Sequence, residues 1–169
     1  MKIIILLIVL LAIGYYYFFI HRKKILIEDM SNAVETFKAA IYGRFYSKYK
    51  TVYTEEKSDL LAMAVTNELF FDKTKSDSVK MFMESNKDII DKEILSLSKD
   101  DEIRKVITQV IRVKATIDIA RGGHSQKVLL NHIKELKRKR IMISGGETPS
   151  PETFKLMAYK FYKSTASKQ

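Results

Sequence analysis

The chain has 169 residues, no cysteine, two prolines, six glycines and a formal net charge of +10 at pH 7. The absence of cysteine excludes disulfides, Cys-ligated metals and thiol catalysis, and the few prolines and glycines argue against an all-β chain with many tight turns. The positive charge is uneven, because residues 25–126 carry 16 basic and 17 acidic side chains whereas residues 127–169 carry 10 basic and 3 acidic ones.

The first apolar stretch begins with Ile3, ends with Ile20 and contains no charged residue. Eighteen residues form about 27 Å of α-helix, close to the hydrocarbon thickness of a bilayer. Five consecutive aromatic residues, from Tyr15 to Phe19, lie at its carboxyl end, where amphipathic rings prefer the headgroup layer. We therefore predict a transmembrane helix with membrane lipid as its partner.

Two other interpretations of this stretch are a buried helix of a soluble domain and a cleaved signal peptide. A buried soluble helix seldom combines this length with an aromatic end and an immediate basic stop. A signal peptide needs a basic segment before its apolar core and small residues after it. Only Lys2 precedes this core, and bulky aromatic residues follow it, so the pattern favours a retained anchor.

Basic residues flank the anchor unequally. Lys2 and the α-amino group precede it, whereas Arg22, Lys23 and Lys24 follow it almost at once. Because basic flanks stay on the cytoplasmic side, we expect the N-terminus outside and the remaining chain in the cytoplasm, with a bacterial inner membrane as the expected location. The three basic residues are candidate contacts for anionic lipid or another anionic partner.

The chain beyond residue 24 shows apolar residues at spacings of three and four, which is typical of amphipathic helices. The first of these helices runs from Met30 to about Tyr49. The second begins after Thr54, a residue type that favours a helix N-cap. A third covers residues 79–97, and its apolar stripe is interrupted at Asn86.

The fourth helix has the clearest pattern. Ser98 or Asp100 is placed to cap it, and apolar, mostly β-branched residues recur at helical spacing from Ile103 onward. Such residues also suit a strand, but the spacing over several turns favours a helix central to the core. Gly122 and Gly123 predict a left-handed helix end.

The last part of the chain predicts two helices joined by a loop. A fifth helix starts near Ser125 and stops at Gly145 and Gly146. Ser150 and Pro151 then open a short final helix, since serine is a good N-cap and proline suits the first helical position.

These patterns predict an all-α protein with one N-terminal transmembrane helix followed by a soluble bundle of five or six helices. We expect residues 1–24 to form the anchor with its basic stop and residues 25–146 to form the bundle. Residues 147–169 are expected to form a short helix and tail that pack on or beside that bundle.

Histidine and carboxylate residues offer little support for catalysis. His132 and Glu135 share one face of the fifth helix, and His124 lies about two turns away. Zinc sites need three or four ligands, and no phosphate-binding, dinucleotide-binding, zinc-protease or nucleophile-elbow motif occurs. We predict no catalytic residue, cofactor or metal; a metal-dependent enzyme built on these three residues is a disfavoured alternative.

A dense run of basic residues marks the end of the fifth helix. Cations are favoured there by the helix dipole, and charge runs are usually solvated faces. Five cations against Glu135 exceed what capping needs, so we expect the run to bind an anionic partner or lipid. Its members are Lys134, Lys137, Arg138, Lys139 and Arg140.

The sequence therefore favours a non-enzymatic, membrane-anchored helical adaptor or accessory subunit of a larger membrane complex, which presents a basic docking surface to a protein partner. No small-molecule substrate is inferred. The alternative is a membrane-tethered nucleic-acid binder that uses the basic C-terminal region with Tyr159, Phe161 and Tyr162. Steep salt dependence of DNA or RNA binding would distinguish it from the adaptor.

Overall fold

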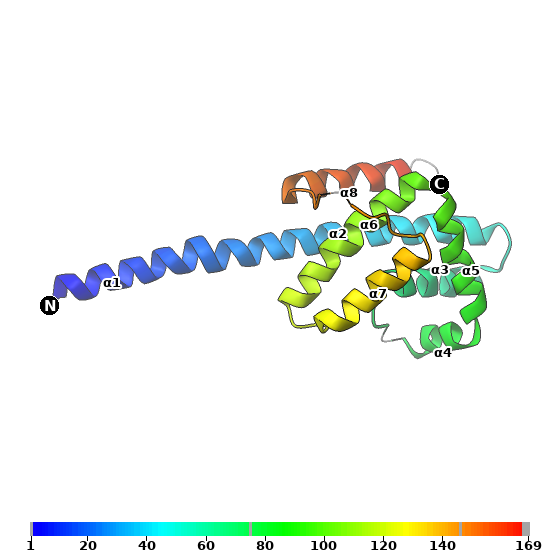
Figure 1. Ribbon diagram of the computed structural model, residues 1–169, viewed down its shortest axis with the longest axis horizontal. Coiled ribbons are helices and arrows are strands. Elements are labelled where there is room, and N and C mark those ends of the chain that lie inside the picture. Colours follow the sequence, from blue (N-terminus) through cyan, green and yellow to red (C-terminus); the bar gives the residue numbers. More distant parts are fainter. Residues whose placement is uncertain (1, 75, 146, 167–169) are drawn as a thin grey trace.

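The computed structural model describes residues 2–74, 76–145 and 147–166. These residues contain helices and connecting turns but no strand, which confirms the all-α prediction (Figure 1). The α-helices are α1 (Lys2–Tyr15), α2 (Arg22–Lys50), α3 (Glu55–Phe70), α4 (Asp77–Ser85), α5 (Lys87–Ser96), α6 (Asp101–Ala120), α7 (Gln126–Arg138) and α8 (Pro151–Ala166). Two short elements accompany them, the π-helix η1 (Tyr16–His21) and the 3-10 helix η2 (Leu97–Lys99).

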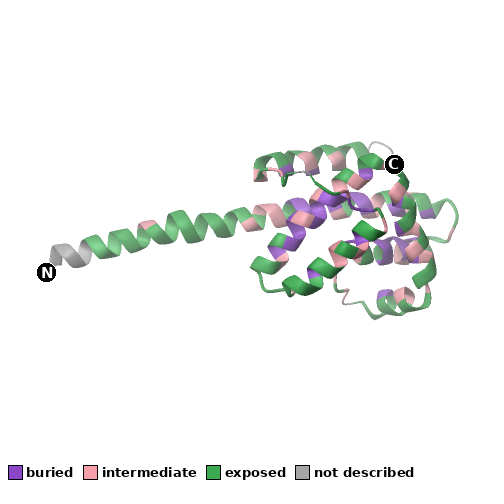
Figure 2. Cartoon of the chain, in the orientation of Figure 1, coloured by how far each residue is buried: buried purple, intermediate pink, exposed green. Residues whose placement is uncertain are grey.

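The N-terminal part of the chain is a rod that projects from the bundle (Figure 1). α1, η1 and α2 follow one another without an intervening loop, and the change to π-helical winding begins within the run of aromatic residues. We call α1 and η1 together the rod. The apolar side chains along residues 7–20 are exposed, in contrast to those inside the bundle (Figure 2).

No helix within the described ranges combines the length and the apolar character that crossing a membrane requires. The span predicted for residues 3–20 stays a prediction.

The bundle is organised around α2, which packs against α3, α6 and α8. Phe37 of α2 is fully buried, and its ring centroid lies 5.1 Å from that of Phe154 and 5.6 Å from that of Phe161, both on α8. Ile41 and Ile107 are also fully buried in the same core. The apolar stripes predicted from spacing thus meet in one core, and the final helix forms part of it.

Helix starts follow the expected cap chemistry in most cases. Asp100, one of the two predicted caps of α6, accepts a hydrogen bond from the Ile103 backbone N–H at 3.0 Å. Ser125 accepts one from Val128 at 3.3 Å at the start of α7. Thr54 occupies the N-cap of α3 as expected, but its side chain makes no capping bond.

Two helix lengths differ from the sequence prediction. The third predicted helix is divided at Asn86, whose backbone leaves the helical conformation (φ −124°, ψ 27°), so α4 and α5 are separate. Its side-chain amide donates to the Phe82 carbonyl at 3.0 Å. The described bundle therefore has seven α-helices, not five or six. The fifth ends at Arg138 rather than at the glycine pair. Arg140 adopts φ 60°, and the Ile141 N–H donates to the Leu136 carbonyl at 2.9 Å, which closes the helix early.

The early end of α7 has a packing cause. Ile141 is fully buried and Met142 is 3% exposed, although both directly follow the basic run. A left-handed residue at the helix end redirects the chain, and here it carries these two side chains into the core. Glycine is the usual residue at such a position. The end of α6 is of this usual kind, since the predicted left-handed conformation of Gly122 is confirmed by its φ of 68°.

Candidate functional site

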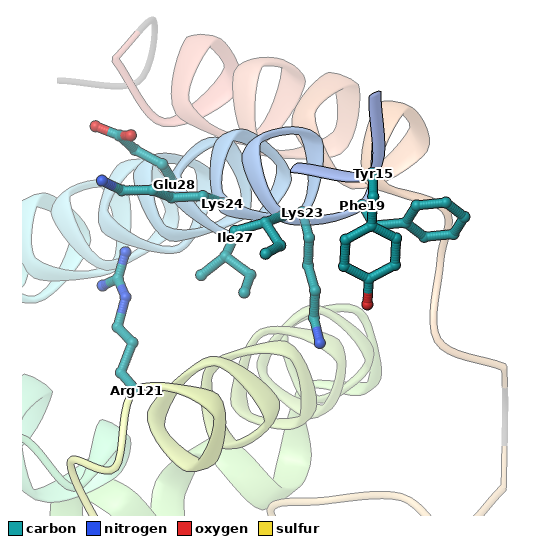
Figure 3. Close-up of a pocket in the computed structure, with 8 residues that line it drawn as sticks. Tyr15, Phe19, Lys23, Lys24, Ile27, Glu28 and Arg121 are labelled. Carbon is teal, nitrogen blue, oxygen red and sulfur yellow. The ribbon is translucent and has the colours of Figure 1, made fainter. Parts of the chain in front are cut away.

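The junction between the rod and the bundle contains an open groove of about 750 Å³ (Figure 3). Rod and α2 residues form one wall, and a residue from the end of α6 forms the other. Its apolar lining residues are Tyr15, Phe19, Ile20 and Ile27, and its charged ones are Lys23, Lys24, Glu28 and Arg121. The groove therefore joins an aromatic, apolar part to a predominantly basic part.

Arg121 reaches the groove because α6 ends beside α2. It is the C-cap residue of α6, and the turn after it is completed by Gly122 in the left-handed conformation. Its Nη1 donates a hydrogen bond to Ser31 Oγ of α2 at 3.0 Å. Figure 3 shows the side chain extending from the end of α6 toward Lys24 and Glu28. Tertiary packing thus adds Arg121 to Lys23 and Lys24 as the third cation of the groove.

The groove has a net positive charge. Lys23, Lys24 and Arg121 are exposed, and within the described part of the chain none of them forms an ion pair. Glu28 is the acidic residue that lines the groove. The neighbouring carboxylate of Asp29 is already paired with Lys155 on α8, at 2.7 Å. Three cations against one carboxylate make this groove suited to an anionic group.

A second groove, of about 340 Å³, continues from the first between α2, α6 and the start of α8. The two grooves share Lys23 and Ile27. Apart from that lysine and two threonines, the lining is apolar and consists of Leu26, Ile27, Met30, Val113, Ile117, Ala120 and Pro151. The junction thus has a basic mouth beside an apolar surface, an arrangement that fits an amphiphilic molecule.

A largely buried charge network links α6 to α2 through Asp72. Lys114 of α6 lies 3.2 Å from Asp72 and also pairs with Asp118. Asp72, which follows α3, lies 2.7 Å from Lys38 of α2. Burial by itself would lower the pKa of Lys38, but the hydrogen bonds and charges of Asp72 and Glu35 outweigh it, and the pKa is raised. No local pattern in the sequence marks this network, because Asp72 is distant in the chain from both lysines.

The structure places the two predicted basic groups at different ends of the bundle. Arg22, Lys23 and Lys24 lie where the rod ends, whereas α7 leads away from the rod, so that its basic end lies far from them (Figure 1).

Two of the cations at the end of α7 have acidic partners. Lys139 pairs with Asp91 at 2.7 Å, and Arg138 with Glu135 at 2.7 Å. The remaining predicted members, Lys134, Lys137 and Arg140, are exposed and form no ion pair within the described ranges. They constitute the free part of the predicted docking surface.

Two of the three histidines, His124 and His132, lie beside the ring of Phe71. The Phe71 ring centroid lies 5.1 Å from that of His124 and 4.9 Å from that of His132. His132 Nε2 lies 3.1 Å from the Leu69 carbonyl oxygen, and burial lowers the pKa of His132. Glu135 is engaged with Arg138. No group of three or more metal-ligating side chains converges within the described residues.

The aromatic residues named for nucleic-acid binding lie on α8. Tyr159 and Tyr162 are exposed there, while Phe161 packs on Phe37. α8 packs on α2, whereas α7, with the basic run, packs on α6. The described contacts therefore place the two exposed tyrosines and the basic run on different parts of the bundle.

Comparison of the chain with protein-family models, with curated proteins and with solved structures found no match.

Proposed function

We propose that this chain is a non-enzymatic, single-pass membrane adaptor, in which residues 3–20 cross the bilayer and the bundle presents a basic surface to an acidic protein partner in a membrane complex. The observation that carries the proposal is the exposed apolar rod that leads directly into the bundle's central helix.

Exposed apolar surface on this scale supports an anchor. Leu11 is 71% exposed and Phe19 is 65% exposed, and the other large apolar side chains within residues 7–20 are similarly uncovered. Soluble monomers rarely leave contiguous apolar patches larger than a few hundred Å² without a partner or a membrane. A bilayer would cover every face of the rod at once, as a helix without a polar face requires.

The length and composition of the rod are compatible with a span formed by α1 and η1 together. α1 contributes 14 residues and η1 six, which correspond to roughly 30 Å of helix. Residues 3–20 include thirteen Ile, Leu, Val and Phe side chains. At roughly 0.3–0.6 kcal/mol each, they favour insertion by about 4–8 kcal/mol in total.

The basic residues after the rod orient the proposed anchor. Arg22, Lys23 and Lys24 outnumber Lys2 and the α-amino group before it. The positive-inside rule therefore favours a cytoplasmic bundle with the N-terminus outside.

The free cations at the end of α7 are suited to a protein partner rather than to the same lipid surface. Lys137 lies eleven residues after the start of α7, a distance of about 16 Å along the helix axis. Attraction between solvated charges decays over about 8–10 Å at physiological ionic strength. Because α7 leads away from the rod (Figure 1), these cations lie beyond this range from a lipid surface at the end of the rod. They are better placed for an acidic patch on a neighbouring protein.

The adaptor proposal can be tested by purifying the full chain from its native membranes with the anchor intact. Lys134→Glu with Lys137→Glu should release a co-purifying partner because like charges then face each other. The matched control is Lys105→Glu with Lys160→Glu, two exposed lysines on α6 and α8 that form no ion pair within the described residues. This control should retain the partner.

Two results would count against this proposal. Loss of the partner in both double variants would show that net charge, not the end of α7, governs binding. Salt-sensitive binding of DNA or RNA that is lost only in the Lys134/Lys137 variant would instead favour the nucleic-acid alternative.

A further inference from the structure

We infer that the junction groove binds the phosphate of an anionic phospholipid headgroup, held by Lys23 and Lys24 after the rod and by Arg121 from α6. This inference rests on the proposed anchor, because a headgroup lies at this level only if the rod occupies the bilayer. Its consequence is that a lipid contact sets the position of the bundle against the membrane surface.

The order of residues along the groove matches the order of groups in a phospholipid. Tyr15, Phe19 and Ile20 line its rod end, and the lysines follow within about one helical turn. From Ile20 to Lys24 the helix rises about 6 Å. The headgroup layer on each side of the hydrocarbon is roughly 5–8 Å thick. Acyl chains beside the aromatic residues would therefore place a phosphate beside the lysines.

The charged groups of the groove are available for such a phosphate. Arg121 carries five N–H donors in a planar fork that suits phosphate oxygens. Of these, Nη1 is directed to the Ser31 hydroxyl, and in the described chain no carboxylate pairs with the guanidinium. Glu28 opposes an anion in the groove, so its neutralisation should strengthen binding.

Arg121 distinguishes a built site from a general attraction between juxtamembrane lysines and an anionic leaflet. It comes from α6, 97 positions after Lys24, and the network of Lys38, Asp72 and Lys114 holds α6 against α2. A cation at a helix C-terminus also interacts with the helix dipole. That interaction needs no lipid, so lipid selectivity is the readout that separates the two roles.

The test uses the full chain in phosphatidylcholine nanodiscs that contain a minor fraction of spin-labelled phosphatidylglycerol or spin-labelled phosphatidylcholine. The motionally restricted fraction of each probe measures the selectivity of the protein for the anionic headgroup. The native chain should prefer phosphatidylglycerol. Arg121→Gln should reduce this preference about fivefold, the factor that corresponds to about 1 kcal/mol for one cation at an anionic surface.

Two matched variants sharpen the result. Lys105→Gln removes the same charge from an exposed position sixteen residues before Arg121 on the same helix and should leave the preference unchanged. Glu28→Gln should increase the preference, because it removes the carboxylate that opposes the phosphate. Thermal unfolding of each variant, monitored by circular dichroism, shows whether the bundle remains folded.

Specific outcomes overturn the inference. Equal preferences in Arg121→Gln and the native chain, or equal losses in Arg121→Gln and Lys105→Gln, would exclude a site built around Arg121. Removal of the preference by excess inorganic phosphate would identify a site for soluble phosphate instead. A chain that is extracted from membranes by alkaline carbonate would contradict the anchor itself, whereas a retained chain without headgroup preference would contradict only this inference.

Discussion

The rod and the bundle use the same kinds of apolar side chain in opposite surroundings. Phe18 in the rod is 65% exposed, whereas Phe37 in α2, nineteen residues later in the same run of helix, is fully buried. The bundle helices have a polar face and an apolar face, so they bury their apolar faces against one another. The rod is apolar all round, and a helix of that kind needs an apolar solvent or a surrounding protein.

The comparison predicts that charges placed in the rod will affect membrane retention and leave the bundle intact. Leu10→Arg with Leu11→Arg should cost about 5–7 kcal/mol of insertion free energy, since each arginine near the helix centre costs roughly 2.5–3.5 kcal/mol. This is the largest effect we expect. Carbonate extraction should release the variant, whereas Leu10→Ala with Leu11→Ala should be retained. Full retention of the arginine variant would remove the basis for a spanning rod.

The corresponding test for the bundle removes a large side chain from its core. Phe37→Ala should lower the free energy of unfolding by about 3–5 kcal/mol, because it removes a buried ring and leaves a cavity. Phe18→Ala makes the same chemical change at an exposed position of the rod and should leave that free energy within about 0.5 kcal/mol. Urea unfolding of both variants measures the difference. Equal effects would show that the rod and the bundle fold as one packed unit.

The charge network provides a smaller test of what holds the bundle together. Asp72→Asn leaves Lys114, which is 8% exposed, without one of its two carboxylate partners. We expect a loss of about 2 kcal/mol, less than for a fully buried pair because solvent reaches Asp72. Asp77→Asn, which breaks the exposed pair with Lys80, is the control and should cost under about 0.5 kcal/mol. A small loss in both variants would show that apolar contacts alone hold α6 against α2.

The N-cap of α6 should have a more modest effect. Asp100 accepts the Ile103 N–H and pairs with Arg44 at 3.0 Å. Asp100→Ala should lower the free energy of unfolding by about 1 kcal/mol, the usual value for a lost cap. Chemical unfolding checks this value, and Asp100→Asn, which preserves a capping oxygen, should restore part of it. Membrane retention should be unchanged in both variants, since α6 lies in the bundle.

The pH dependence linked to His132 is the smallest effect. Burial lowers the pKa of His132 below its usual 6.5, with further lowering from the charges of Lys114 and Lys139, although the Leu69 carbonyl and Glu68 oppose the shift. The folded state therefore favours neutral imidazole, and its contribution to stability is fully present above about pH 6.5. This contribution is lost as the pH falls from there through the folded-state pKa.

Urea unfolding of the native chain and of His132→Gln across this pH range measures the contribution. The stability of the native chain relative to the variant should decrease as the pH falls. A difference between the two proteins that is independent of pH would show that protonation of His132 is not linked to unfolding.

The limits of sequence-based prediction appear at particular residues. Gly122 was a recognisable left-handed helix end, whereas Phe71 and Arg140 adopt positive φ without being glycine. At Arg140 this conformation is imposed by tertiary packing, because the chain must turn there to bury Ile141. Asn86 interrupted the predicted apolar stripe, but only the folded chain shows that the helix itself is divided there.

The candidate site was predictable in part. Lys23 and Lys24 are recognisable because they follow an apolar stretch directly in the sequence. Arg121 is not recognisable, because no local pattern sets it apart from other basic residues near helix ends. Its proximity to α2 depends on how α6 packs, and the same packing separates the basic end of α7 from the rod.

The sequence by itself determined the helical class, most helix starts and the contrast between an apolar N-terminal stretch and amphipathic helices after it. Those properties follow from residue spacing and capping groups within one or two helical turns. Only the tertiary structure decided where α7 ends, which cations are already paired and which residues share the junction groove. These properties depend on contacts between helices that are distant in the sequence, since burial of their apolar faces fixes which polar side chains become neighbours.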